Sequence, residues 1–341
     1  MPRSTVLELA MVSLLTTALG GCGQYFEQTE ELEGILPPLP INEVTPKSTP
    51  PHRDETPAVP SQKPAPTVPA KPAPAAHLNY YGGRVIANVK VHAVFWGSGV
   101  DPAVKSAMPG FYAALVSSPF MDMLAEYDTN IPALDGTPGS RQHIGRGTFG
   151  TSQTITPSVA SKSLTDAQLQ VELKAQLSGE HLPEPDANTV YMLHLPPGIT
   201  VEVNGASSCA NFCAYHSTLQ RSPQPVHYAV IPYLGAGSGC EATCGIGTLI
   251  EKTTALASQQ LAEVVISGDT GTAGGNAGSA AAAWCDDAQG QMGDLCGGEQ
   301  GTLPGTSYVI RAVWSNKASM CVLPGSEPTG TASSAAVKRL K

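Results

Sequence analysis

Prolines are concentrated in one stretch of this 341-residue chain. Residues 37–74 hold 13 of the 30 prolines, separated largely by Lys, Thr, Ala and Val. Proline has no backbone N–H, and the stretch has no apolar periodicity, so it can form neither helix, sheet nor core. We expect a disordered, semi-rigid stalk over residues 22–76, which leaves globular structure to the sequence that follows.

The first 21 residues have the layout of a signal peptide, because Arg3 precedes a short apolar run and small residues follow it. The segment Leu19-Gly20-Gly21-Cys22 resembles the lipobox of bacterial lipoproteins. That resemblance implies cleavage before Cys22, an acyl anchor on its sulfur, and a place in the cell envelope as an outer membrane lipoprotein. Glu8 departs from the usual pattern, and the alternative is an ordinary secretory signal that releases the protein to the outside.

Charge and composition limit the partners of the chain. The formal net charge is −9, and charged residues make up only 14% of the sequence. A phosphate backbone is bound by a positive field, so nucleic acid is not an expected partner. Hydrophobic residues make up 41%, enough for a substantial core. We expect one globular domain over residues 77–325 and a flexible tail over residues 326–341.

Periodicity within this domain predicts an α/β fold, with a mixed sheet and flanking helices. Alternating apolar residues predict a half-buried strand over 87–96, with His92 on its polar face. Buried strands are expected over residues 189–195, 226–233 and 307–314. Helices are expected over residues 101–117, 119–127, 165–177 and 248–266, and the third begins with the capping-box spacing of Thr165 and Gln168.

The cysteines of an exported domain are expected to form disulfides. The sequence has eight, and acylation of Cys22 would leave seven. The two Cys-x-x-x-Cys motifs could together bind zinc, but export favours disulfides with undetermined connectivity among Cys209, Cys213, Cys240 and Cys244. Cys296 and Cys321 bracket the last expected strand and are predicted to pair. Cys285 is then the leftover free thiol, inert or reactive.

The helix expected over residues 248–266 has the residue spacing of a zinc hydrolase helix, but amide side chains stand at the positions of a metal ligand and the general base. Gln259 and Glu263 are four residues apart and share a face, as do the two histidines of a His-Glu-x-x-His motif. An amide at Gln259 is a poor zinc ligand. Gln260 stands in the position of the general base, and an amide cannot accept a proton near neutral pH.

Several motifs resemble the EXORDIUM, or phosphate-induced protein, family over most of residues 77–325. They are Tyr80-Tyr81-Gly82-Gly83 before a strand ending Phe95-Trp96-Gly97, the segment 142–147, Cys209-x-x-x-Cys213-x-x-His216, and Cys240-x-x-x-Cys244. Bacterial relatives of this type carry His-Glu-x-x-Glu on the late helix, followed by Trp-Tyr-Asp and Glu-x-Gly-Asp-x-Cys segments, a set that resembles a zincin-like metal site. The matching positions here are Gln259, Gln260 and Glu263, then Trp284-Cys285-Asp286, then the segment from Gln291 to Cys296.

The resemblance therefore implies a zincin-like late helix with a degenerate site, in which Glu263 and Asp294 keep carboxylates while Gln259, Gln260 and Gln291 are amides. We expect a non-catalytic, metalloprotease-like domain without a cofactor that binds an unknown extracellular or envelope ligand. One alternative is an active exported hydrolase or peptidase whose zinc is held by a rearranged set that includes His216, Glu263 and Asp294, with His227 and Asp286 as further candidates. Another is a structural envelope component.

Overall fold

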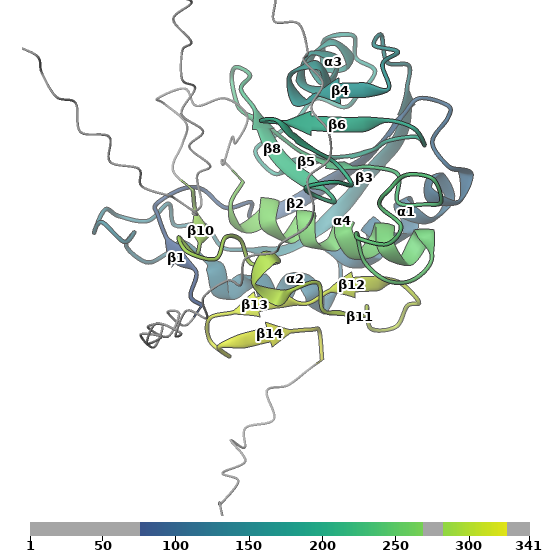
Figure 1. Ribbon diagram of the computed structural model, residues 1–341. Coiled ribbons are helices and arrows are strands. Elements are labelled where there is room, and N and C mark those ends of the chain that lie inside the picture. The colour runs from purple at the N-terminus through teal and green to yellow at the C-terminus, as the bar shows by residue number, and fades with distance from the viewer. Residues whose placement is uncertain (1–75, 269–281, 326–341) are drawn as a thin grey trace, which may run out of the picture. The chain divides into compact units, whose positions relative to one another are not determined.

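A central five-stranded sheet organises the protein in this computed structural model, which describes residues 76–268 and 282–325 (Figure 1). Its strands are β2 (Asn88–Trp96), β3 (Gly145–Ile155), β5 (Thr189–His194), β8 (Tyr215–Leu219) and β9 (Val226–Ile231), in the order β3-β2-β5-β9-β8. The first four in that order are parallel, and β8 runs antiparallel to β9 at one edge. The expectation of a mixed sheet with helices is confirmed.

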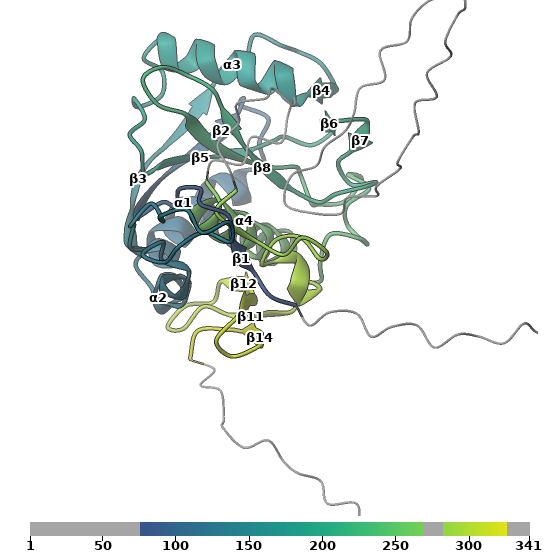
Figure 2. The same cartoon turned by 90° about the vertical axis from the view of Figure 1, so that its left-hand side faces the viewer.

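Helices cover both faces of this sheet, so the described domain has three layers (Figures 1 and 2). One face packs against α1 (Pro102–Val116), α2 (Pro119–Leu124) with a 3-10 turn (Ala125–Tyr127), and α4 (Leu249–Ile266). The other packs against α3 (Asp166–Ser178), beside a small sheet of β4 (Ser163–Thr165), β6 (Thr200–Val203) and β7 (Ala206–Ser207). Side chains of β2 enter both cores, with Val91 in the first and Val94 in the second.

The C-terminal part packs on the outer side of α4 (Figure 1). It contains a 3-10 turn (Asp294–Cys296) and two hairpins, β11 (Gln300–Thr302) with β12 (Val309–Arg311), and β13 (Val313–Ser315) with β14 (Met320–Val322). A further pair joins β1 (Asn79–Tyr80) to β10 (Trp284–Cys285). The prediction of a single strand over residues 307–314 is therefore wrong, because its first half pairs with β11 and its second half with β14.

The prediction of a polar, half-buried face on β2 is also wrong. His92 is buried, its Nδ1 accepts a hydrogen bond from the amide of Thr151 at 3.1 Å, and its ring stacks on Tyr191. The cause is the parallel pairing of β2 with both β3 and β5, since helices cover both faces of a parallel sheet. The contacts of His92 with Thr151 and Tyr191 give it a structural role.

Strand β3 is not expected from the sequence, because its glycine-rich segment lacks apolar alternation. The glycines are needed for the close approach to β2. A Cβ atom at Gly147 would lie 2.1 Å from the carbonyl oxygen of Val89, and one at Gly150 would lie 2.3 Å from the ring of His92. Strand β8, at one edge of the sheet, is not expected from the sequence either.

The four expected helices are confirmed, and their start signals work as the sequence indicates. The side chain of Asp101 caps α1, which continues through Pro109. Capping boxes begin α3 at Thr165 and α4 at Thr248. The segments predicted to be a signal peptide (residues 1–21), a stalk (up to residue 75) and a tail (from residue 326) lie outside the described residues, as does the segment 269–281. Among the described residues, no helix combines the length and the hydropathy that a membrane span requires.

Candidate functional site

The three residues at the positions of a zinc hydrolase motif lie together on α4, which is buried along residues 252–266. Gln259, Gln260 and Glu263 are 6%, 4% and 3% exposed. The Nε2 of Gln259 donates to Oε1 of Glu263 at 2.9 Å, and the Nε2 of Gln260 donates to Oε2 at 3.0 Å. Both carboxyl oxygens of Glu263 therefore accept hydrogen bonds from the two amides that precede it in the motif.

Two residues from other elements complete this arrangement. His216, on the edge strand β8, has its Nδ1 3.0 Å from Oε1 of Gln260 and 3.6 Å from Oε2 of Glu263. Arg311, at the end of β12, donates from Nη1 to Oε1 of Gln259 at 2.8 Å. We call these five residues the Glu263 network. Each amide in it donates to the carboxylate and accepts from a basic side chain.

The loop before the second 3-10 turn closes over the network. A Cβ atom at Gly293 would lie 2.4 Å from both Cγ of Gln259 and Oε1 of Glu263, so glycine is the residue that fits there. Its backbone also hydrogen-bonds to Glu263. The neighbouring Asp294 is exposed, and its carboxylate accepts from the backbone N–H of Gln291 at 3.2 Å. The Oε1 of Gln291 is buried without a partner among the described residues.

Burial controls the ionisation of both titratable groups on the sheet side of the network. Burial, assisted by the negative charge of Asp294, raises the pKa of Glu263 to about 8, although hydrogen bonds from Gln259 and Gly293 and the charge of Arg311 oppose the shift. Burial lowers the pKa of His216 to about 4, although the hydrogen bond to Gln260 acts the other way. At neutral pH the carboxyl is therefore mainly protonated and the imidazole is neutral.

The network does not fit a divalent metal ion. A zinc site needs several lone pairs directed at one point, but the oxygens of Glu263 accept from amides, and those of Gln259 and Gln260 face Arg311 and His216. The guanidinium of Arg311 would also repel a cation. Within residues 76–268 and 282–325, no three His, Cys, Asp or Glu side chains are grouped to hold a metal. We therefore derive no metal-dependent step.

The residues proposed for a rearranged metal site are only partly brought together. His216 and Glu263 are neighbours, with Nδ1 of the imidazole 3.6 Å from Oε2 of the carboxyl, but that nitrogen is hydrogen-bonded to Gln260. The carboxylate of Asp286 accepts backbone N–H groups from His77, Ala288 and Gln289, the last two in its own turn. His227 lies on β9 with its Nδ1 3.4 Å from the hydroxyl of Thr218.

Disulfides link the segments around the site. Cys209 pairs with Cys240 and Cys213 with Cys244, and together they join the segment before β8 to the segment before α4. The expected pair of Cys296 with Cys321 is present and ties the second 3-10 turn to β14. Cys285 is also disulfide-bonded, so the prediction of a free thiol there is wrong. That prediction depends on setting Cys22 aside, which leaves an odd number of cysteines.

Arg311 is the functional residue that sequence reasoning missed. It is the one charged residue in the apolar run 307–314, whose pattern predicts a strand and does not indicate what the charge contacts. A half-buried cation of this kind needs an acceptor, and Gln259 supplies it. The signal that could have found it is the charge itself, placed inside an otherwise apolar run.

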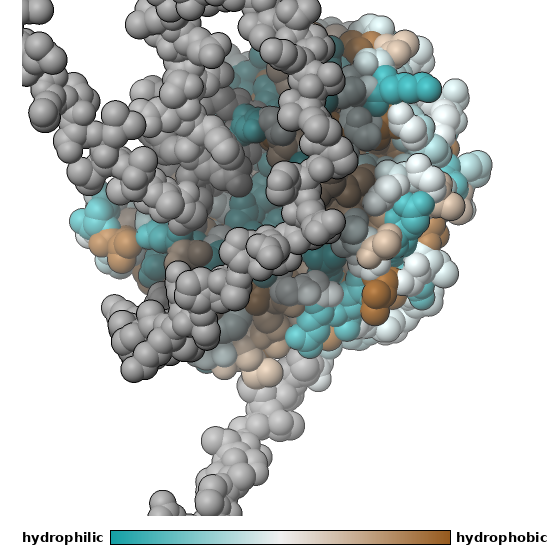
Figure 3. Space-filling model, viewed as in Figure 1, coloured by the Kyte–Doolittle hydropathy of each residue, from teal (hydrophilic) through white to brown (hydrophobic). Residues whose placement is uncertain are grey.

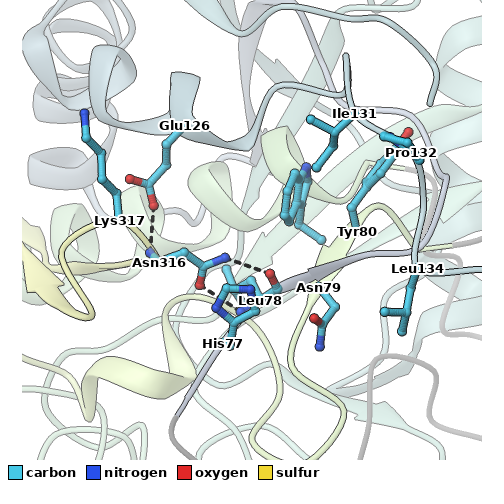
Figure 4. A pocket seen from close by; sticks show the side chains of 11 residues that line it. His77, Leu78, Asn79, Tyr80, Glu126, Ile131, Pro132, Leu134, Asn316 and Lys317 are labelled. Carbon is cyan, nitrogen blue, oxygen red and sulfur yellow. Dashed lines mark hydrogen bonds between the residues drawn. The ribbon is translucent and has the colours of Figure 1, made fainter. Parts of the chain in front are cut away.

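A separate surface pocket of about 430 Å³ lies away from this network (Figure 4). Asn316 fixes one side of it, donating from Nδ2 to the carbonyl of Leu78 and accepting from its amide. Ile131 and Leu134 form the other side and are 42% and 64% exposed. On the face visible in Figure 3, exposed hydrophobic residues are scattered among hydrophilic ones. None of the pocket-lining residues belongs to α4, so the pocket is distinct from the Glu263 network.

Comparisons with protein-family models, curated proteins and solved structures find no match to this chain. The similarity to the EXORDIUM family therefore rests on the sequence motifs described above and stays a prediction.

Proposed function

We propose that this protein is an exported binding protein whose globular domain has a metalloprotease-like core without catalytic activity. The observation that carries the proposal is the closed hydrogen bonding of the Glu263 network. A hydrolytic metal needs free lone pairs and a base that can accept a proton. Here the amides of Gln259 and Gln260 occupy both oxygens of Glu263, and the guanidinium of Arg311 adds a fixed positive charge.

Three described disulfides support an oxidising location, because such bonds persist outside the cytosol. The signal peptide, the proline-rich spacer and the acyl anchor at Cys22 are supported by the sequence alone. In this proposal the signal peptide exports the chain, the acyl anchor attaches it to the membrane, and the spacer holds the globular domain at a distance from that membrane. The domain can then bind an extracellular or envelope ligand. Nucleic acid is a poor candidate for that ligand because the chain is acidic.

The proposal is tested by metal content and peptidase activity of the purified protein. We expect no zinc above background after dialysis, and no cleavage of a mixed peptide library with or without added zinc. The matched variant Gln259→His/Gln260→Glu restores His-Glu-x-x-Glu on α4. Because Arg311 lies next to residue 259, we expect this variant to gain zinc only when Arg311→Ala is added. One zinc per chain in the natural protein, lost together with cleavage in Glu263→Gln, would instead establish a metal-dependent hydrolase.

A further inference from the structure

Arg311 has a second side that the Glu263 network does not use. Gln300 is directly opposite Arg311 in the register of β11 and β12, so the two side chains share one face of the hairpin. The Nε of Arg311 and the Nε2 of Gln300 are both buried, and neither has a hydrogen-bond partner among the described residues. Buried donors without acceptors are rare and destabilising. Two of them on one face point to a missing acceptor.

Positive charge at this position exceeds the negative charge that faces it. Lys252, on α4, is buried and donates to the carbonyl oxygen of Glu241 at 3.1 Å. Neither Lys252 nor Arg311 forms an ion pair in the described part of the chain. Two carboxyl groups act on Arg311, those of Glu263 and Asp294. Glu263 is mainly protonated at neutral pH, so Asp294 is the carboxylate left to balance Arg311.

Two glycines lie directly beside the unpartnered donors. A Cβ atom at Gly245 would lie 3.2 Å from Nε2 of Gln300 and 3.7 Å from Nη2 of Arg311. A Cβ atom at Gly298 would lie 3.5 Å from Cζ of Arg311. Both glycines have positive φ, which brings bare backbone close to the guanidinium. An oxygen atom placed where the Cβ of Gly245 would be lies near hydrogen-bonding distance of Gln300.

We propose that Arg311, Gln300, Gly245 and Gly298 form a carboxylate-binding site, which we call the Arg311 site, and that it recognises a carboxylate of a peptide ligand. The inference deepens the proposed function by naming the ligand class, and it rests on that function. One oxygen accepts from Gln300 and the other from the free edge of Arg311, which suits a planar, two-oxygen acceptor. A phosphate group has a third oxygen and a larger charge, which the two unpartnered donors of this site do not match.

The test is calorimetric titration of the full-length oxidised protein with three peptides. These are acetyl-tetraalanine with a free C-terminal carboxylate, the same peptide as its C-terminal amide, and an amidated peptide with glutamate in place of one central alanine. We expect at least tenfold tighter binding of one carboxylate peptide than of the tetraalanine amide. The carboxylate peptide that binds identifies the source as a chain end or an acidic side chain.

Gln300→Glu provides the sharpest variant, because it puts a carboxylate of the protein itself beside Arg311. We expect it to weaken carboxylate binding at least tenfold and to raise the melting temperature by about 2–4 °C. Gln168→Glu makes the same charge change at the exposed start of α3, where glutamate also completes a capping box, and should leave binding unchanged.

The inference is overturned by equal binding of the carboxylate and amide peptides, by no binding of any peptide, by tighter binding of inorganic phosphate, or by unchanged binding in Gln300→Glu. Its failure is distinguishable from that of the proposed function. Loss of carboxylate selectivity without zinc or peptidase activity leaves a non-catalytic binding protein, whereas zinc-dependent cleavage removes the proposed function whatever the Arg311 site binds.

Discussion

Replacing Glu263 with glutamine should remove a large pH dependence of folding stability. The carboxyl has a pKa of about 8 in the folded protein and an ordinary value near 4.5, so the folded state retains a proton that the unfolded state releases. A group whose pKa is raised by folding contributes stability below its unfolded pKa and loses it as the pH rises to the folded pKa. The free energy of unfolding should therefore fall between pH 4.5 and pH 8.

The size of this effect follows from the pKa difference. Each pH unit between the two pKa values changes the free energy of unfolding by about 1.4 kcal/mol. Between pH 5.5 and pH 8.5, Glu263 should therefore account for a loss of about 3 kcal/mol in the natural protein. Glu263→Gln has no proton to lose and should lack this loss, whatever its stability at pH 5.5.

The assay is urea unfolding of the oxidised protein at pH 5.5 and pH 8.5, followed by tryptophan fluorescence. Glu172→Gln is the matched control. Burial acts to raise the pKa of Glu172, but hydrogen bonds from Ser158 and Gln176 outweigh it and lower the pKa. Glu172 is therefore ionised in both states across this range, and its variant should keep the natural slope. Equal losses in the natural protein and Glu263→Gln would refute the reasoning.

Three further predictions concern the disulfides, the buried histidines and the anchor. Replacing both Cys296 and Cys321 with alanine removes a bond spanning 25 residues and should lower the free energy of unfolding by about 2–4 kcal/mol in the same urea assay; an unchanged midpoint would contradict this. Burial lowers the pKa of His194 to about 3 and that of His216 to about 4, so both contribute stability above pH 6.5 that is lost as the pH falls through these values. Proton NMR should show neither ring titrating between pH 8 and pH 5, and a midpoint near 6.5 for either would show that it is not buried in solution. The lipobox predicts that mass spectrometry finds diacylglycerol on Cys22. Acylation consumes the thiol of Cys22, so an acylated Cys22 cannot be the disulfide partner of Cys285. A disulfide-linked peptide joining Cys22 to Cys285 in the non-reduced protein would therefore reject the anchor in favour of ordinary secretion.

The helices are predicted well because capping residues and apolar spacing act between residues that are close in the sequence. The capping residues Thr165 and Thr248, the helix-starting pair at Asp101 and the apolar stripe of α4 each act over one or two turns. Helical spacing in the same way assigns Gln259, Gln260 and Glu263 to neighbouring positions of one helix. The contacts that these three side chains make with each other follow from that spacing and were predictable.

The parts that could not be predicted depend on residues far apart in the chain. Arg311 meets Gln259 across 52 residues, and His216 meets Gln260 across 44. Strand β3 pairs closely with β2 because Gly147 and Gly150 have no side chains, and hydrophobic periodicity does not detect a strand of this kind. The division of residues 307–314 between two hairpins depends on which other segments pair with them.

The paired bonds of Cys209 with Cys240 and Cys213 with Cys244 have a consequence for how the domain survives damage. Both enclose the same stretch, which includes β8 and β9. If an extracellular protease cut the backbone once between residues 214 and 239, the two fragments would stay covalently joined at two points. Such a nicked chain would migrate as one band on a gel without reductant and as two bands after reduction, so a single backbone cut there need not release the edge strand from the helix that carries Glu263.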